Sequence, residues 1–187
     1  AFGGNVIMTA DTHQRASDRT AEAAENLDVD IVTMVQGDEP LVYPEMVEMA
    51  SEPLVNDPEI VCSNLTSKIQ SQQDLQDVNT VKVVMDREGF ALYFSRSPVP
   101  VAGKTYLHLG LYAYRVRFLR IFTTLAPTPL ENAEKLEQLR ALEHGFRIRV
   151  VEVESESWGI DTPADLEAFE ELLRSANGPA QMTGINT

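Results

Sequence analysis

Cysteine, basic residues and long apolar runs are all scarce in this sequence, and each shortage excludes a class of protein. Cys62 is the only cysteine among 187 residues, so no internal disulfide can form and a reducing cytoplasm is the expected compartment. No apolar run approaches the roughly 20 residues that a membrane-spanning helix needs, so we expect no membrane partner. Glycine-rich phosphate loops, zinc-ligand spacings and nucleophile elbows are also missing from the sequence.

The charge balance is strongly acidic. Lys and Arg number 15 against 29 Asp and Glu, which gives a net charge of −14. Nucleic acid and anionic lipid both require a basic surface, so neither is an expected partner. A small anionic substrate stays possible if a metal ion or a few local cations neutralise it.

Hydrophobic residues make up 43% of the chain, which suffices for the core of one domain. We assign residues 1–177 to that domain and residues 178–187 to a flexible tail. The chain opens without Met and enters a predicted strand at residues 6–8 almost at once. Such a beginning is typical of the middle of a fold, so we expect the domain to be incomplete at its N-terminus.

Strand and helix patterns alternate along the chain, which indicates an α/β fold with a mostly parallel sheet and helices on both faces. The β-branched run at residues 31–35 is typical of a strand buried in a parallel sheet. Residues 81–85 and 90–94 flank a turn that ends in Gly89, which predicts a β-hairpin insertion. Further strands are expected at 60–65, 108–115 and 148–153.

Helices are expected at residues 18–27 and 44–55, and two more carry start signals. Thr128, Pro129 and Glu131 form a capping-box pattern, and this helix is expected to run to His144 before Gly145. The last helix begins at Thr162-Pro163, and its expected inward residues are Leu166, Phe169 and Leu173.

Two aspartates follow predicted strands, where open α/β sheets bind their ligands. Asp38 lies in a Gln-Gly-Asp-Glu-Pro turn, and Asp161 immediately precedes the helix that Thr162 caps. Two carboxylates at strand ends can hold Mg²⁺. The alternatives are a simple turn for Asp38 and a helix-terminus acid for Asp161.

Two further pairs of side chains are candidates for binding a ligand. His108 and Tyr112 are four residues apart on a predicted strand and point to the same face, although strand packing explains them equally. Glu134 and Glu137 lie opposite a leucine arc on their helix, where a solvated acidic face is the alternative.

Taken in order, the segments resemble the CMP-Kdo synthetases, the cytidylyltransferases of 3-deoxy-manno-octulosonate (Kdo). Each segment alone is weak, but the ordered set is specific. Its main pieces are Val-Gln-Gly-Asp-Glu-Pro (35–40), His-Leu-Gly-Leu-Tyr-Ala-Tyr-Arg (108–115), Pro-Leu-Glu-Asn-Ala-Glu-Lys-Leu-Glu-Gln-Leu-Arg (129–140) and Gly-Ile-Asp-Thr-Pro-Ala-Asp-Leu (159–166). The resemblance also covers His-Gln-Arg-Ala-Ser-Asp-Arg (13–19) and the segment 81–96.

The resemblance implies a Rossmann-like nucleotidyltransferase fold and transfer of CMP from CTP to the anomeric hydroxyl of Kdo in lipopolysaccharide biosynthesis, with release of pyrophosphate. It implies a homodimer and Mg²⁺ held by Asp38 and Asp161 as the catalytic acids. The positions that match substrate-binding residues are Arg19, Gln36, His108, Tyr112, Glu137 and Gln138, with His13 and Ser17 in a nearby loop.

The sequence departs from this family in several places. The family's opening phosphate loop, of the type Ala-Arg-x-x-Ser-x-Arg-Leu-Pro-x-Lys-Pro, is not among these residues, and the loop 100–107 is short. Arg15-Ala16-Ser17 replaces a Ser-Gly-Thr type sequence. We therefore expect weak CTP binding by the 187 residues, with a Kd above ~1 mM. A cytidylyltransferase for another sugar acid and a non-catalytic, sugar-acid-binding fragment stay open as alternatives.

Overall fold

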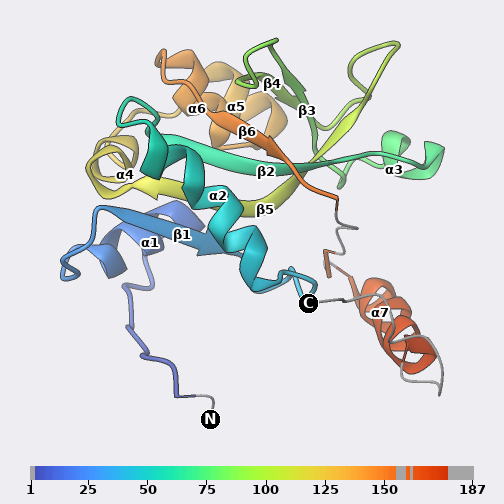
Figure 1. The fold of residues 1–187 in the computed structure, drawn as a ribbon, viewed down its shortest axis with the longest axis horizontal. Coiled ribbons are helices and arrows are strands. Elements are labelled where there is room, and N and C mark those ends of the chain that lie inside the picture. Colours follow the sequence, from blue (N-terminus) through green and yellow to red (C-terminus); the bar gives the residue numbers. More distant parts are fainter. Residues whose placement is uncertain (1–2, 155–158, 161, 177–187) are drawn as a thin grey trace.

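One six-stranded sheet forms the centre of the protein (Figure 1). The computed structural model describes residues 3–154, 159–160 and 162–176, so Asp161 and the predicted tail 178–187 lie outside the described residues. The strand order is β4–β3–β5–β2–β6, and β1 also pairs with β5. The strands are β1 (Ile31–Val35), β2 (Cys62–Lys68), β3 (Lys82–Met85), β4 (Ala91–Ser95), β5 (Tyr106–Arg115) and β6 (Arg149–Glu152).

The directions of the strands explain where the prediction of a mostly parallel sheet succeeds and where it is wrong. β1, β2 and β3 all pair antiparallel with β5, and β6 pairs parallel with β2, so these four strands run in one direction. However, β5 runs in the opposite direction and pairs with β1, β2 and β3. The β2–β6 ladder is therefore the one parallel ladder among the described strands. Apolar runs report burial on both faces of a strand and carry no information on the direction of its neighbour.

Helices cover both faces of the sheet, as predicted (Figure 1). α2 (Pro44–Asn56) packs on the face where β5 presents Leu109 and Leu111. α1 (Ala16–Ala24), α4 (Val116–Phe122) and α6 (Gln138–Glu143) pack on the opposite face, where β5 presents Tyr112 and Tyr114. This alternation follows from the two-residue period of a strand, and each buried leucine contributes about 1.5–3 kcal/mol.

The predicted β-hairpin is confirmed by the antiparallel pairing of β3 and β4. Gly89 closes its turn with φ of +79°, a conformation that glycine adopts without strain. The Asp86 carboxylate accepts hydrogen bonds of 2.9 Å from the backbone N–H groups of Glu88 and Phe90. The hairpin is therefore fixed from within by one side chain.

The helix predicted over residues 128–144 is instead two short helices, α5 (Pro129–Glu134) and α6. The break is at Lys135, which adopts a left-handed φ of 59°. The Thr128 N–H donates to the Glu131 carboxylate, as the capping-box pattern predicted. The break buries Leu136 and brings Glu137 and Gln138 to the start of a new helix.

Two other predictions are wrong. Residues 6–8 form no strand: Val6 is 82% exposed, and among the described residues no strand pairs with this segment. A run of three apolar residues is too short to predict a strand, because a strand also needs a neighbouring strand to pair with. α7 (Pro163–Ala176) forms, but Leu166 and Leu173 are exposed instead of inward. α3 (Gln72–Gln76) and α4 had no prediction at all.

Candidate active site

An open pocket of about 800 Å³ lies where the end of β1, the middle of the sheet and the start of α6 meet. Five of the residues predicted for the site line it, although they come from three distant segments of the sequence. They are Gln36, Asp38, His108, Glu137 and Gln138. The fold thus gathers half of the predicted site residues in one place.

Asp38 lies three residues beyond the end of β1 and carries an oxygen without a hydrogen-bond partner among the described residues. Its Oδ1 atom is buried and accepts no hydrogen bond within the described part of the chain. Leaving a buried acceptor unsatisfied costs about 1–3 kcal/mol, so such an atom suits a ligand that arrives later. Carboxylate oxygens are the ligands that Mg²⁺ prefers, and Asp38 therefore fits a magnesium site.

The Asp38 backbone also connects the pocket with the end of the chain, because its carbonyl accepts a 3.0 Å hydrogen bond from the Ile160 N–H. Asp161, the second predicted metal ligand, lies outside the described residues. Among the residues that are described, no group of three or more His, Cys, Asp and Glu side chains is arranged to hold a metal ion. Within the described residues, the prediction of a metal site therefore rests on Asp38.

Tyr112 lies behind the pocket and joins two of its lining residues. Its hydroxyl contacts His108 Nε2 and accepts a hydrogen bond from Gln138 Nε2. The tyrosine is fully buried, so it does not line the pocket as the resemblance implied. Because the Tyr112 hydroxyl oxygen accepts from Gln138, we assign the hydroxyl as the donor to His108 Nε2. The neutral imidazole then carries its proton on Nδ1.

The His108 ring is neutral at physiological pH. Desolvation by the surrounding side chains lowers its pKa to about 4. Phe94 packs edge-on against the ring with 5.7 Å between the centroids. His108 is therefore a positioned hydrogen-bonding group rather than a cation.

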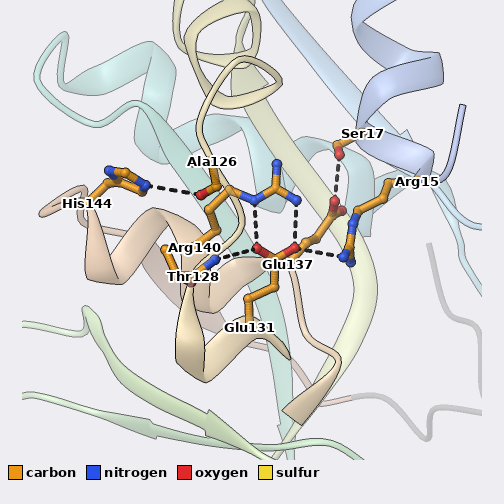
Figure 2. A network of polar contacts seen from close by, with 8 residues as sticks. All are labelled: Arg15, Ser17, Ala126, Thr128, Glu131, Glu137, Arg140 and His144. Atoms are coloured by element: carbon orange, nitrogen blue, oxygen red, sulfur yellow. Dashed lines mark hydrogen bonds and ion pairs between the residues drawn. The ribbon is translucent and has the colours of Figure 1, made fainter. Parts of the chain in front are cut away.

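Glu137 is a half-buried carboxylate that faces Ser17 of α1 (Figure 2). The Ser17 hydroxyl donates a 2.6 Å hydrogen bond to Glu137 Oε2. Burial raises the pKa of Glu137, while this hydrogen bond and the charges of Arg15 and Arg140 lower it. Glu134 is also engaged, because it accepts from the Tyr93 hydroxyl and the Arg96 N–H, so a solvated acidic face is wrong for both glutamates.

Arg19 and His13, two further residues predicted for the site, also lie outside this pocket. Arg19 donates 3.0 Å hydrogen bonds to Thr9 and to the Ala10 carbonyl, and it lines a neighbouring hollow of about 500 Å³ that shares Gln36 and Asp38 with the pocket. His13 contacts Glu22. Both side chains fasten the segment before α1 to that helix.

Three cations that were not predicted for the site line the pocket: Arg15, Arg96 and Lys135. They lie among six lining carboxylates within the described residues. Arg96 is held by Glu134, whose carbonyl accepts from its Nε at 2.9 Å. Its position at the end of a predicted strand, like that of Asp38, was the signal that could have identified it.

The sequence signature of the cytidylyltransferase family matches residues 1–150. The chain belongs to the cytidylyltransferase family. This cytidylyltransferase is 53% identical over 189 residues to the 3-deoxy-manno-octulosonate cytidylyltransferase of Geobacter metallireducens, covering 92% of the chain and 74% of that relative. It is 50% identical over 190 residues to the enzyme of the same name from Pelobacter propionicus, covering 93% and 74%.

Among solved structures, this cytidylyltransferase is similar to CMP:2-keto-3-deoxy-manno-octonic acid synthetase complexed with CTP. The TM-score is 0.86 at 38% identity, over 93% of this chain and 74% of the other. The expected nucleotidyltransferase fold is thereby confirmed, and the cytidylyltransferase is a nucleotidyltransferase enzyme. None of its described helices is long and apolar enough to cross a membrane.

Proposed function

We propose that this cytidylyltransferase transfers CMP from CTP to the anomeric hydroxyl of Kdo and releases pyrophosphate, a step of lipopolysaccharide biosynthesis. The observation that carries the proposal is the gathering of Gln36, His108 and Gln138 beside the carboxylates of Asp38 and Glu137 in one open pocket. A sugar acid presents many hydroxyl groups, and neutral amide and imidazole groups both donate to and accept from hydroxyls. Similarity to enzymes named for Kdo supports this choice of sugar.

The sugar-binding side chains are held before any substrate arrives. Tyr112 connects His108 with Gln138, and Ser17 holds Glu137. Such preorganisation lowers the entropic cost of holding the attacking hydroxyl near the α-phosphate. In the reaction, the anomeric oxygen forms a bond to the α-phosphorus, the bond from that phosphorus to the pyrophosphate oxygen breaks, and the hydroxyl proton is released to solvent.

The pocket cations offset the charge of the substrates. Both CTP and a sugar acid are anionic, and the chain as a whole carries −14. Arg96 and Lys135 supply local positive charge at the pocket wall, where a net charge of the wrong sign would otherwise repel the substrates.

Asp38 and, by the resemblance, Asp161 would hold Mg²⁺. The buried, unpartnered Oδ1 of Asp38 is the observation that supports such a site. When bound, Mg²⁺ neutralises negative charge that develops on the phosphates. Asp38 itself keeps a carboxylate oxygen at the pocket wall, at a position fixed by the end of β1.

The proposal extends to assembly and location. A homodimer is inferred from the resemblance, and a cytoplasmic location from the single cysteine, Cys62, which is buried. Light scattering of the purified protein tests the first, with twice the monomer mass expected. Fractionation of producing cells tests the second.

Release of pyrophosphate in the presence of CTP, Mg²⁺ and a panel of sugar acids tests the proposed reaction. The panel comprises Kdo, its 8-amino analogue and a sialic acid, and UTP replaces CTP in the control. We expect kcat/KM to be highest for Kdo with CTP. Higher kcat/KM for another sugar acid would assign the enzyme to that sugar. Calorimetric binding of Kdo without any nucleotide binding would favour a non-catalytic, sugar-acid-binding protein.

A further inference from the structure

A fully buried carboxylate, Glu131, lies at the junction of α1, α5 and α6 (Figure 2). Arg140 donates to it twice, through Nε at 2.8 Å and Nη2 at 2.6 Å. The Thr128 N–H donates at 3.3 Å, and Arg15 Nη2 lies 2.8 Å from Oε1. One carboxylate therefore holds two guanidinium groups.

The pair of Glu131 and Arg140 is complete without Arg15. The two parallel contacts form the bidentate geometry that matches a guanidinium with a carboxylate. The Arg140 side chain is only 6% exposed, and its guanidinium lies 5.1 Å from the centre of the Phe122 ring. Glu131 and Arg140 thus neutralise each other, and the buried pair needs no second cation.

Arg15 differs from Arg140 in exposure and in position. Its side chain is 31% exposed and lines the pocket, whereas Arg140 does not. Within the described part of the chain, Glu131 is the one ion-pair partner of Arg15. Together the Glu131 carboxylate and the two guanidinium groups carry a net charge of +1, and Arg15 lines the pocket beside Glu137, whose carboxylate offsets part of that charge.

The other two cations of the pocket, Arg96 and Lys135, are placed differently from Arg15. Arg96 uses Nε and Nη1 on the carbonyl oxygens of Glu134 and Val78. Lys135 is an exposed residue in the left-handed turn between α5 and α6. Arg15 combines a fixed guanidinium with partial exposure to the pocket, and a fixed guanidinium loses little entropy when it binds an oxyanion.

We propose that Arg15 is a further substrate-binding residue that donates to an oxyanion in the pocket, and that Glu131 and Arg140 are positioning residues that hold its guanidinium there. The inference rests on the proposed function and deepens it. The oxyanion is either the carboxylate of the sugar acid or a phosphate of the nucleotide, which share the chemistry that a guanidinium recognises.

Steady-state kinetics of Arg15→Gln, with each substrate varied in turn, tests the role of Arg15. We expect the KM of one substrate to rise about 10-fold or more, because a charge-assisted hydrogen bond is lost. A rise in the KM of Kdo identifies the carboxylate, and a rise in the KM of CTP identifies a phosphate. Arg15→Lys restores part of the affinity, since it keeps the charge without the fork.

Arg120→Gln is the matched control, because this exposed arginine of α4 does not line the pocket and its loss changes the net charge equally. It leaves both KM values unchanged. Unchanged KM values for both substrates in Arg15→Gln, with an unchanged melting temperature, overturn the inference. Absence of turnover in the wild type overturns the proposed function instead, and calorimetric titration with Kdo and with CTP then still compares wild type with Arg15→Gln.

Glu131→Gln tests the positioning role, in the wild-type and in the Arg15→Gln background. If Glu131 acts through Arg15, Glu131→Gln raises the same KM that Arg15→Gln raises, and it causes no further rise in the Arg15→Gln background. The melting temperature falls in both backgrounds. A KM rise of equal size in both backgrounds rejects the positioning role. If Glu131→Gln does not fold, Arg15→Gln and Arg15→Lys still decide the role of Arg15.

Discussion

The hydroxyl of Ser17 donates a 2.6 Å hydrogen bond to the carboxylate of Glu137, and 120 positions of sequence separate the two residues. Ser17 is buried in α1, and Glu137 lies at the start of α6. The contact joins two elements on the same face of the sheet beside the pocket. It stabilises a carboxylate that burial disfavours, so the fold gives up stability to keep an acid at this place.

Glu137→Gln should therefore stabilise the protein at neutral pH and weaken binding of the sugar acid. Burial raises the folded-state pKa of Glu137 above its unfolded value, so its contribution is favourable below the unfolded pKa and is lost as pH rises through the folded pKa. Glutamine removes this loss while its amide oxygen can still accept from Ser17. We expect a gain of about 0.5–2 kcal/mol in the free energy of unfolding at pH 7.

Urea unfolding at pH 7 and at pH 4 measures this gain, which should vanish at the lower pH. Glu48→Gln on α2 is the control, because this glutamate is exposed and lies outside the pocket. Loss of stability in Glu137→Gln at pH 7 would contradict the prediction. The KM for Kdo should rise in Glu137→Gln and stay unchanged in Glu48→Gln.

Asp38→Asn should lower kcat about 10²-fold or more while the protein still folds. The reason is the unpartnered, buried Oδ1 atom, because the variant removes the charge of this oxygen without breaking a hydrogen bond to it. Turnover as a function of Mg²⁺ concentration, together with the melting temperature, measures both effects. By the resemblance, Asp161→Asn should lose activity to a similar extent.

Asp28→Asn is the control for Asp38→Asn, since Asp28 is exposed in the loop between α1 and β1. It should leave both kcat and the Mg²⁺ dependence unchanged. Normal turnover in Asp38→Asn would reject the assignment of Asp38 to the metal. A large fall in its melting temperature would favour the alternative that Asp38 only builds the turn after β1.

The local part of the fold was predictable from the sequence because its signals are local. The hairpin between β3 and β4 follows from turn chemistry at Gly89, and α2 begins at Pro44, a residue that suits the first turn of a helix. The position of β5 among strands of the opposite direction was not predictable, because ladder partners are chosen by long-range packing. The left-handed turn at Lys135 carries no glycine and had no signal either.

The site divides in the same way. Asp38 and His108 were predictable, because strand ends and a recognised motif mark them, and the pocket contains both. Arg15 was not, because the carboxylate that holds it belongs to a helix more than a hundred residues further along the chain. Ion pairs between distant elements leave no periodic pattern in a sequence.

His108→Ala should raise the KM for Kdo and change the affinity for CTP little. His108 lines the pocket together with Gln138, and Tyr112 connects the two side chains, so loss of the imidazole removes one of the two contacts of the Tyr112 hydroxyl. KM values measured for each substrate at saturating concentrations of the other decide this. An equal loss of affinity for CTP would show that His108 faces the nucleotide.

His108 should also make the folded protein less stable in mild acid. Desolvation lowers its folded-state pKa from 6.5 to about 4, so between these values the unfolded chain binds a proton that the folded chain does not. The free energy of unfolding therefore falls as pH decreases from 6.5 towards 4. At 1.36 kcal/mol per pKa unit, this contribution amounts to roughly 3 kcal/mol at most.

Urea unfolding of the wild type and of His108→Gln between pH 7 and pH 4 measures the contribution of this residue. His108→Gln should lose stability less steeply as pH falls, because glutamine takes up no proton. His144→Gln is the matched control, since this histidine is exposed at the end of α6 and does not line the pocket. Identical slopes in all three proteins would mean that His108 binds its proton as readily in the folded protein as in the unfolded chain, and the assignment of a neutral imidazole bonded to Tyr112 would then be wrong.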